Sequence, residues 1–161
     1  MAKSLSGMGL PFAVALFRHE LDQWSPGEHN GTFRGNNHAF VTARAAIEHF
    51  WATPDFADRI CELSALLEAR LEEMAAEYGF ARKGRGMMQG LDIGSGDLAQ
   101  EITGNAFKRG LLIETSGAHD EVVKILSPLT ISTDDFSTGL KILEDSIAEA
   151  VNTYPFRIAA E

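Results

Sequence analysis

The sequence has 161 residues, of which 45% are hydrophobic and 23% are charged, and its formal net charge is -9. This length and composition are those of a globular domain with a sizeable core. The negative charge argues against a general nucleic-acid-binding protein, because such a protein needs a basic face to neutralise phosphates.

A reducing compartment is expected because Cys61 is the only cysteine, so no disulfide can form within the chain. No apolar run approaches the roughly 20 residues that span a bilayer. The apolar run 10–17 lacks the small-residue cleavage site of a secretory signal. We therefore expect a cytoplasmic protein that binds no membrane and no nucleic acid, and we predict no metal site.

A lysine stands near the start of the chain, where Lys3 lies among small residues just before an apolar run. A desolvated lysine amine becomes a nucleophile that can form a Schiff base with an aldehyde cofactor. Spacing alone also fits a solvated charge near a chain terminus. The run that follows, residues 11–17, is apolar throughout, which predicts a short strand buried on both faces.

A loop rich in glycine and asparagine follows over residues 25–37. Its backbone N–H groups and the Thr32 hydroxyl can hold a phosphate. The alternative is a polar turn in which Asn36 or Asn37 caps the next helix. Apolar residues at spacings of three and four predict that helix over residues 39–51.

The rest of the chain predicts a long amphipathic helix, three short strands and two further helices. The long helix covers about 55–78, with an apolar stripe of Ile60, Leu63, Leu67, Leu71 and Met74. Residues 82–86 read as a basic turn. Three strands are then expected over 87–93, 111–114 and 122–126, with helices over 97–109 and from 133 to about 151. Phe107 is expected to be buried, and Thr133 to cap the last helix.

One local motif favours a different function. Residues 91–97 (LDIGSGD) resemble the first strand and glycine loop of S-adenosylmethionine-dependent methyltransferases, and Glu114 could supply the acid that binds ribose. Such a fold needs several further strand–helix units, and only one strand and one helix are predicted after Glu114. A methyltransferase-like domain therefore stands as an alternative.

Five segments carry a stronger resemblance: 3–11 (KSLSGMGLP), 29–37 (HNGTFRGNN), 85–93 (RGMMQGLDI), 110–113 (GLLI) and 123–131 (VKILSPLTI). They resemble the cofactor-lysine segment, the phosphate segment and successive C-terminal strands of class III (omega) pyridoxal-phosphate aminotransferases. Within this family, segments 33–37, 113–117 and 128–132 look most like the diaminobutyrate–2-oxoglutarate aminotransferases of ectoine synthesis.

The resemblance implies particular roles for two residues. Lys3 would bind pyridoxal 5'-phosphate as a Schiff base and then act as the general base. Thr32 would bind the cofactor phosphate of the neighbouring subunit in a homodimer. The amino group would pass from L-glutamate to L-aspartate 4-semialdehyde, giving L-2,4-diaminobutyrate and 2-oxoglutarate. Lys124 departs from the family, since many members carry arginine there and lysine cannot form the same bidentate pair with a carboxylate.

The implied fold class is α/β to α+β, as in the fold type I of pyridoxal-phosphate-dependent transferases. Residues 1–54 would be a remnant of the large cofactor-binding domain. Residues 55–151 would form the long helix and a small C-terminal domain with a three-stranded sheet, and 152–161 a loose tail.

The sequence contains no counterpart of the family segments that precede the cofactor lysine. We therefore expect residues 1–151 to be the C-terminal part of an aminotransferase, from a truncated gene or an incomplete sequence. Such a chain should fold its small domain, should not transaminate alone, and should pair with the missing half or form a homodimer. A non-catalytic α+β interaction module derived from the same family is the other alternative.

Overall fold

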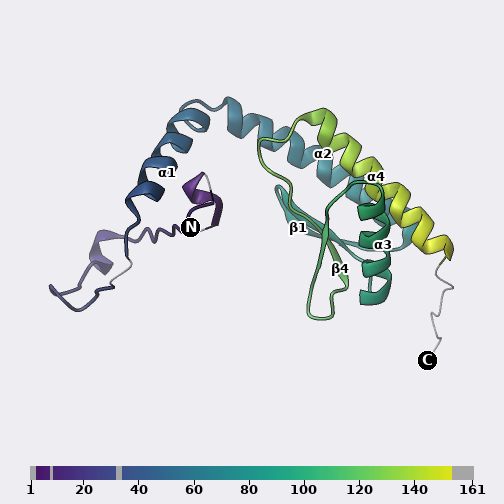
Figure 1. The fold of residues 1–161 in the computed structure, drawn as a ribbon, viewed down its shortest axis with the longest axis horizontal. Coiled ribbons are helices and arrows are strands. Elements are labelled where there is room, and N and C mark those ends of the chain that lie inside the picture. The colour runs from purple at the N-terminus through teal and green to yellow at the C-terminus, as the bar shows by residue number, and fades with distance from the viewer. Residues whose placement is uncertain (1–2, 8, 32–33, 154–161) are drawn as a thin grey trace. The chain divides into compact units, whose positions relative to one another are not determined.

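The computed structural model describes residues 3–7, 9–31 and 34–153, with the side chain of Lys3 excepted. The chain divides into two compact units, Met1–Ala57 and Asp58–Glu161, and each is described by itself. Figure 1 shows the helices and strands with their labels. The assignment of residues 1–54 to a large domain and 55–151 to a small one stays a prediction.

The first unit is built around α1 (Asn37–Phe50). Two short 3-10 helices precede it, η1 (Lys3–Ser6) and η2 (His19–Leu21). The helix begins where it does because the Asn36 side chain accepts hydrogen bonds from the N–H groups of His38 and Ala39. The predicted capping turn is therefore confirmed, with Asn36 as the cap.

Residues 11–17 form no strand, so that prediction was wrong. The segment is irregular, with Phe12 and Val14 half-buried and the residues between them exposed. A strand needs a neighbouring strand to pair its backbone N–H and C=O groups. No strand occurs in the described part of the first unit, so residues 11–17 have no neighbouring strand there.

The second unit packs three helices on one face of an antiparallel sheet (Figure 1). The helices are α2 (Asp55–Tyr78), whose first turn belongs to the first unit, α3 (Gly96–Lys108) and α4 (Thr133–Thr153). The strands are β1 (Ala81–Arg85), β2 (Met88–Asp92), β3 (Glu114–Ser116) and β4 (Val122–Ile125), in the order β1-β2-β4-β3. The core joins the predicted stripe of α2 to Leu91 and Val123 of the sheet and to Ile147 of α4.

The predicted fold class is confirmed, but the sheet has four strands and not three. The additional strand is β1, which was predicted to be a basic turn. Its basic residues, of which Lys83 and Arg85 are exposed and Arg82 is half-buried, gave no apolar pattern for a strand at the sheet edge. The strand predicted at 111–114 lies three residues later, as β3. Leu111 and Ile113 instead line the space between the sheet and α4, which explains their apolar character.

Two helix details also differ from prediction. Phe107 points outward at 68% exposure, because the helix buries Ile102 and Ala106 instead. The cap of α4 is Ser132 and not Thr133: the Ser132 hydroxyl accepts from the N–H of Asp135 at 3.0 Å. Arg59 of α2 donates to the carbonyls of Leu129 and Ile131, which fastens the segment before this cap.

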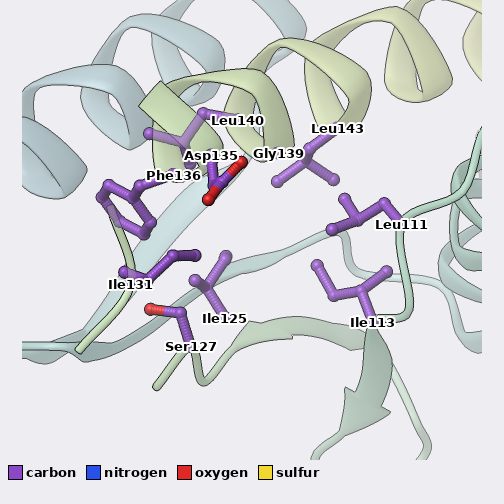
Figure 2. Close-up of a pocket in the computed structure, with 10 residues that line it drawn as sticks. All are labelled: Leu111, Ile113, Ile125, Ser127, Ile131, Asp135, Phe136, Gly139, Leu140 and Leu143. Carbon is purple, nitrogen blue, oxygen red and sulfur yellow. The ribbon is translucent and has the colours of Figure 1, made fainter. Parts of the chain in front are cut away.

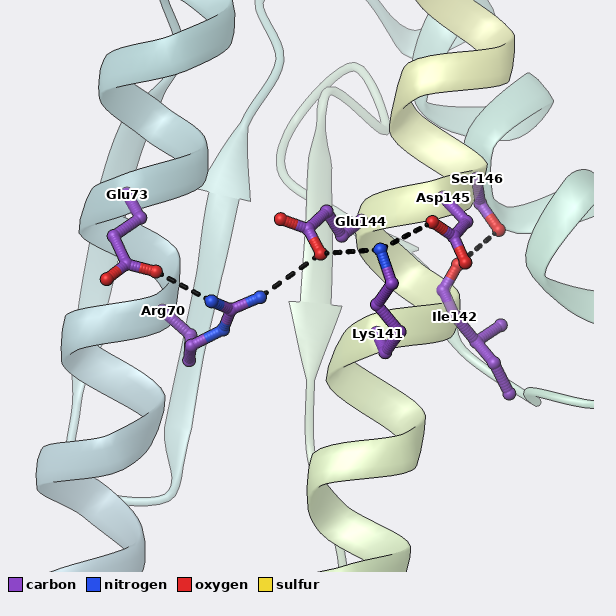
Figure 3. A network of polar contacts seen from close by, with 7 residues as sticks. All are labelled: Arg70, Glu73, Lys141, Ile142, Glu144, Asp145 and Ser146. Carbon is purple, nitrogen blue, oxygen red and sulfur yellow. Dashed lines mark hydrogen bonds and ion pairs between the residues drawn. The ribbon is translucent and has the colours of Figure 1, made fainter.

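A polar network joins α2 to α4 at the edge of the core (Figure 3). Arg70 of α2 contacts Glu73 at 2.7 Å on its own helix and Glu144 of α4 at 3.2 Å. Lys141 contacts the same Glu144 carboxylate and also Asp145. The network therefore links α2 to α4 beside a largely apolar core, in which Ser146 is also buried.

Two glycines of α3 give a matched test of how closely this helix packs against the loop 117–121. A Cβ at Gly96 would lie 2.3 Å from the His119 carbonyl oxygen, whereas one at Gly104 would meet nothing within 4 Å. We expect Gly96→Ala to lower the free energy of unfolding by about 1–3 kcal/mol through overpacking. Gly104→Ala should raise it by about 1 kcal/mol, because alanine favours a helix interior.

Urea unfolding followed by far-ultraviolet circular dichroism measures both variants. The two substitutions add the same methyl group to the same helix, so helix propensity alone predicts the same sign for both. A stabilised Gly96→Ala variant would contradict the close approach of the 117–121 loop to α3.

Candidate functional site

The lysine segment is held against α1 by close packing of small residues. The Gly7 N–H donates to the Ser4 carbonyl at 2.9 Å, and Ser6 is fully buried. A Cβ at Gly7 would lie 2.6 Å from the Cβ of Ala46, and the backbone there has φ +71°. Only glycine therefore allows this approach, which fixes the backbone that carries Lys3.

The face of α1 that receives this segment is also made of small residues. Ala39 and Ala43 are buried, and Ala46 lies one turn further along. The periodicity predicted this buried face, but it placed Phe40 and Ile47 on it, and both are about half exposed. The sequence signal for this docking face is the set of alanines Ala39, Ala43 and Ala46, which recur at spacings of four and three residues.

The end of the threonine segment leads directly into the N-terminus of α1. The Arg34 N–H donates to the Gly31 carbonyl at 3.1 Å, and the Arg34 guanidinium donates to the His29 carbonyl at 3.0 Å. Gly35 has φ +91° and lies against the ring of Phe40. The segment is thus tied on both sides of residues 32–33 and leads directly into the Asn36 cap.

The structure describes the segments that adjoin the two predicted site residues. Lys3 is the first residue of η1, with its side chain outside the described part, and Thr32 lies outside the described residues altogether. Lys3 belongs to η1, which packs on α1, and residues 34–36 lead into the first turn of the same helix. Their roles stay predictions.

The face of the sheet opposite the helices carries paired charges. In register, Lys83 lies opposite Gly90, Gly90 opposite Lys124, and Lys124 opposite Glu114. The Lys124 ammonium contacts the Glu114 carboxylate at 3.2 Å. Glu114 is therefore neutralised across the strands, and Lys124 is a paired strand residue with 29% of its side chain exposed.

Asp92 forms the tightest ion pair of this face, at 2.6 Å from the Lys83 ammonium. That hydrogen bond, followed by one from the Gly94 N–H at 3.0 Å, lowers the pKa of Asp92 below its ordinary value of 3.8. The glycine loop after β2 therefore forms the turn that connects this strand to α3. The sheet is antiparallel, unlike the parallel sheet that presents a nucleotide-binding loop.

The Asp92 carboxylate should make stability depend on pH in the acid range. Because its pKa is lower in the folded than in the unfolded chain, its stabilising effect is complete above about pH 4 and disappears as the pH falls further. The unfolding free energies of the protein and of Asp92→Asn should therefore differ at about pH 6 and converge near pH 2. A difference that grows on acidification would contradict the pairing with Lys83.

A small cavity of about 90 Å³ lies between the sheet and α4 (Figure 2). Its wall is apolar except for Ser127 and Asp135, and the buried Ser127 hydroxyl has no hydrogen-bond partner in the described part of the chain. The Asp135 carboxylate accepts from the Ser132 hydroxyl at 2.7 Å at the start of α4. The cavity is a packing defect of the core, too small and too apolar for catalysis.

The described residues contain no helix long and apolar enough to cross a membrane. Within the same ranges, no group of three or more histidine, cysteine, aspartate or glutamate side chains is placed to hold a metal ion.

Sequence comparison finds one family over most of the chain. The family model described as aminotransferase class-III matches residues 1–147. The diaminobutyrate–2-oxoglutarate transaminase of Vibrio cholerae is 51% identical over 152 residues, which cover 92% of this chain and 37% of that protein. The transaminase of the same name from Halomonas elongata is 51% identical over 154 residues, with the same two coverages.

A solved structure shows the same fold. The lysine aminotransferase from M. tuberculosis in the internal aldimine form superposes with a TM-score of 0.70 and 25% identity, covering 78% of this chain and 29% of that one. The chain therefore spans little more than a third of the length of the curated relatives it matches.

Proposed function

This chain belongs to the class III aminotransferases, and we propose that it is the C-terminal part of an enzyme that transfers the amino group of L-glutamate to L-aspartate 4-semialdehyde. The products would be L-2,4-diaminobutyrate and 2-oxoglutarate, as in ectoine synthesis. The observation that carries this proposal is the identity of about 50% to proteins named diaminobutyrate–2-oxoglutarate transaminase.

The residues of the first unit that would hold pyridoxal phosphate are Lys3 and Thr32. When bound, this cofactor supplies an aldehyde and an electron sink. The Lys3 amine would attach to the aldehyde carbon and later move the proton at the substrate carbon. The close packing of Gly7 on α1 supports this role, because a fixed backbone limits where the amine can reach.

Thr32 would donate its hydroxyl to the cofactor phosphate of a neighbouring subunit, so the active enzyme would be a homodimer. The hydrogen bonds of Arg34 and the Asn36 cap support this role, since they tie the threonine segment to the N-terminus of α1. The substrates of the proposed enzyme are small molecules, and we propose that the enzyme is cytoplasmic.

A chimera tests the proposal. The part of the Vibrio cholerae transaminase that matches this chain is replaced by residues 1–153 of this chain, and the purified chimera is supplied with pyridoxal phosphate. We expect it to form 2-oxoglutarate from L-glutamate when L-aspartate 4-semialdehyde is the acceptor. The present chain alone should form none, because it spans only part of the enzyme.

The parent transaminase is the positive control for the assay, and pyruvate is the alternative acceptor. A folded chimera that binds the cofactor but transfers faster to pyruvate would overturn the proposed substrate. A chimera that binds the cofactor and transfers to neither acceptor would overturn the assignment of activity.

A further inference from the structure

The cavity between the sheet and α4 is left open by a glycine inside the helix. Gly139 lines the cavity and lies within α4, where a glycine destabilises a helix relative to an alanine. A Cβ at this position would lie 3.6 Å from the Cδ1 of Leu111, which is an ordinary contact distance. An alanine would therefore fit, and its methyl group would take up part of the space that the present wall leaves.

The wall of the cavity carries one hydroxyl group that lacks a partner. The Ser127 side chain lines the cavity (Figure 2), and its buried Oγ makes no hydrogen bond within the described residues. A buried hydroxyl is unfavourable unless it is paired, so an acceptor atom placed in the cavity would be stabilised. Water is a poor occupant, because a buried water makes about three hydrogen bonds and only Ser127 and Asp135 offer polar side chains there.

The cavity reaches solvent beside the first turn of α4. Leu111, Ile113 and Ile131 of its wall are only half-buried, and Asp135 is exposed. Arg59 donates to the Ile131 carbonyl, which holds this side of the opening in place. The Asp135 carboxylate at the opening disfavours an anionic ligand.

We propose that this cavity is a binding site for a small neutral molecule with a compact apolar body and one acceptor oxygen, such as a short branched alcohol. The oxygen accepts from the Ser127 hydroxyl, and the body lies against Ile125 and Leu143. A cavity of about 150 Å³ holds benzene, so about 90 Å³ holds about four non-hydrogen atoms. The site does not depend on the proposed function, because L-glutamate and L-aspartate 4-semialdehyde are larger and each carries a carboxylate.

Nuclear magnetic resonance of the full chain, labelled at its isoleucine methyl groups, tests this site with 2-propanol as the probe. We expect saturable shifts at Ile113, Ile125 and Ile131, with a dissociation constant of about 0.1–10 mM. Ile102 is buried in the same core but does not line the cavity, so its methyl signals should not move. Acetate has the same number of non-hydrogen atoms and a negative charge, and it should bind at least about tenfold more weakly.

Two variants separate the volume of the site from its hydroxyl. Gly139→Ala should weaken 2-propanol binding at least about fourfold, which is roughly the effect of one buried CH₂ group. Gly104→Ala is the matched control, because it makes the same change in α3 away from the cavity, and it should leave binding unchanged. Ser127→Ala removes the donor and should weaken 2-propanol binding about 2- to 10-fold.

Xenon supplies a second probe, because it enters apolar cavities but accepts no hydrogen bond. Its binding should fall in Gly139→Ala and persist in Ser127→Ala. Shifts that grow linearly with 2-propanol and spread over all isoleucines would overturn the site, and so would undiminished binding of both probes to Gly139→Ala. Equal 2-propanol affinity with and without the Ser127 hydroxyl, or tighter binding of acetate, would overturn the proposed class of ligand.

Discussion

Replacing Lys3 by alanine in the Vibrio cholerae chimera should abolish covalent attachment of pyridoxal phosphate. The lysine amine is the nucleophile for the aldehyde, and alanine has no group to replace it. Loss of the same amine as general base should lower kcat by about 10²- to 10⁴-fold. The attachment is measured directly: borohydride reduction followed by peptide mapping should place the added cofactor mass on the peptide that contains Lys3.

Lys108→Ala is the matched control, since this lysine lies on α3 and contacts only the Asn105 side chain among the described residues. That variant should keep both the covalent cofactor and the rate. Addition of a small primary amine should restore part of the rate to Lys3→Ala, because it supplies the missing base. A reduced cofactor found on another lysine would show that Lys3 has no catalytic role in this chain.

The apolar patterns predicted the helices of the second unit well, because their apolar stripes are buried in one shared core. The stripe of α2 was predicted residue by residue, and Leu63, Leu67, Leu71 and Met74 are all buried. β1 could not be found this way, since an edge strand with exposed basic residues shows no alternation of apolar residues. β1 forms an antiparallel hairpin with β2, in which Arg85 lies opposite Met88, and this pairing decides where the strand lies.

The patterns failed in the first unit for the opposite reason. Residues 11–17 have the composition of a buried strand, and Phe40 and Ile47 have the spacing of a buried helix face. Neither prediction holds because burial requires a partner surface that this chain does not provide in its described residues. Apolar residues serve interfaces as well as cores, and the sequence pattern alone cannot distinguish an interface from a core.

The capping turn and the candidate phosphate site were alternatives in the sequence; the structure confirms the capping turn, and the phosphate role of Thr32 stays a prediction. Asn36 caps α1 with its side chain, while the phosphate role was assigned to Thr32 four residues earlier. A helix N-terminus also favours an anion through its free N–H groups and its dipole. The family resemblance, and not the local pattern, is what selects Thr32 as the ligand.

Leu67→Ala should be the most destabilising single change in the second unit. Leu67 is completely buried at the centre of α2, where it belongs to the core shared with the sheet and α4. Truncating a leucine in such a core costs about 2–5 kcal/mol, through lost burial and the cavity left behind. Against a total stability of about 5–15 kcal/mol for a domain, this is enough to populate the unfolded state.

The test uses Leu112→Ala as its control, because Leu112 is 82% exposed and loses the same atoms. Urea unfolding followed by circular dichroism should show a large fall in stability for Leu67→Ala and a change within about 0.5 kcal/mol for Leu112→Ala. Equal effects would mean that α2 is not held by this core. A selective loss at Leu67 would show that the second unit is stabilised by its own core.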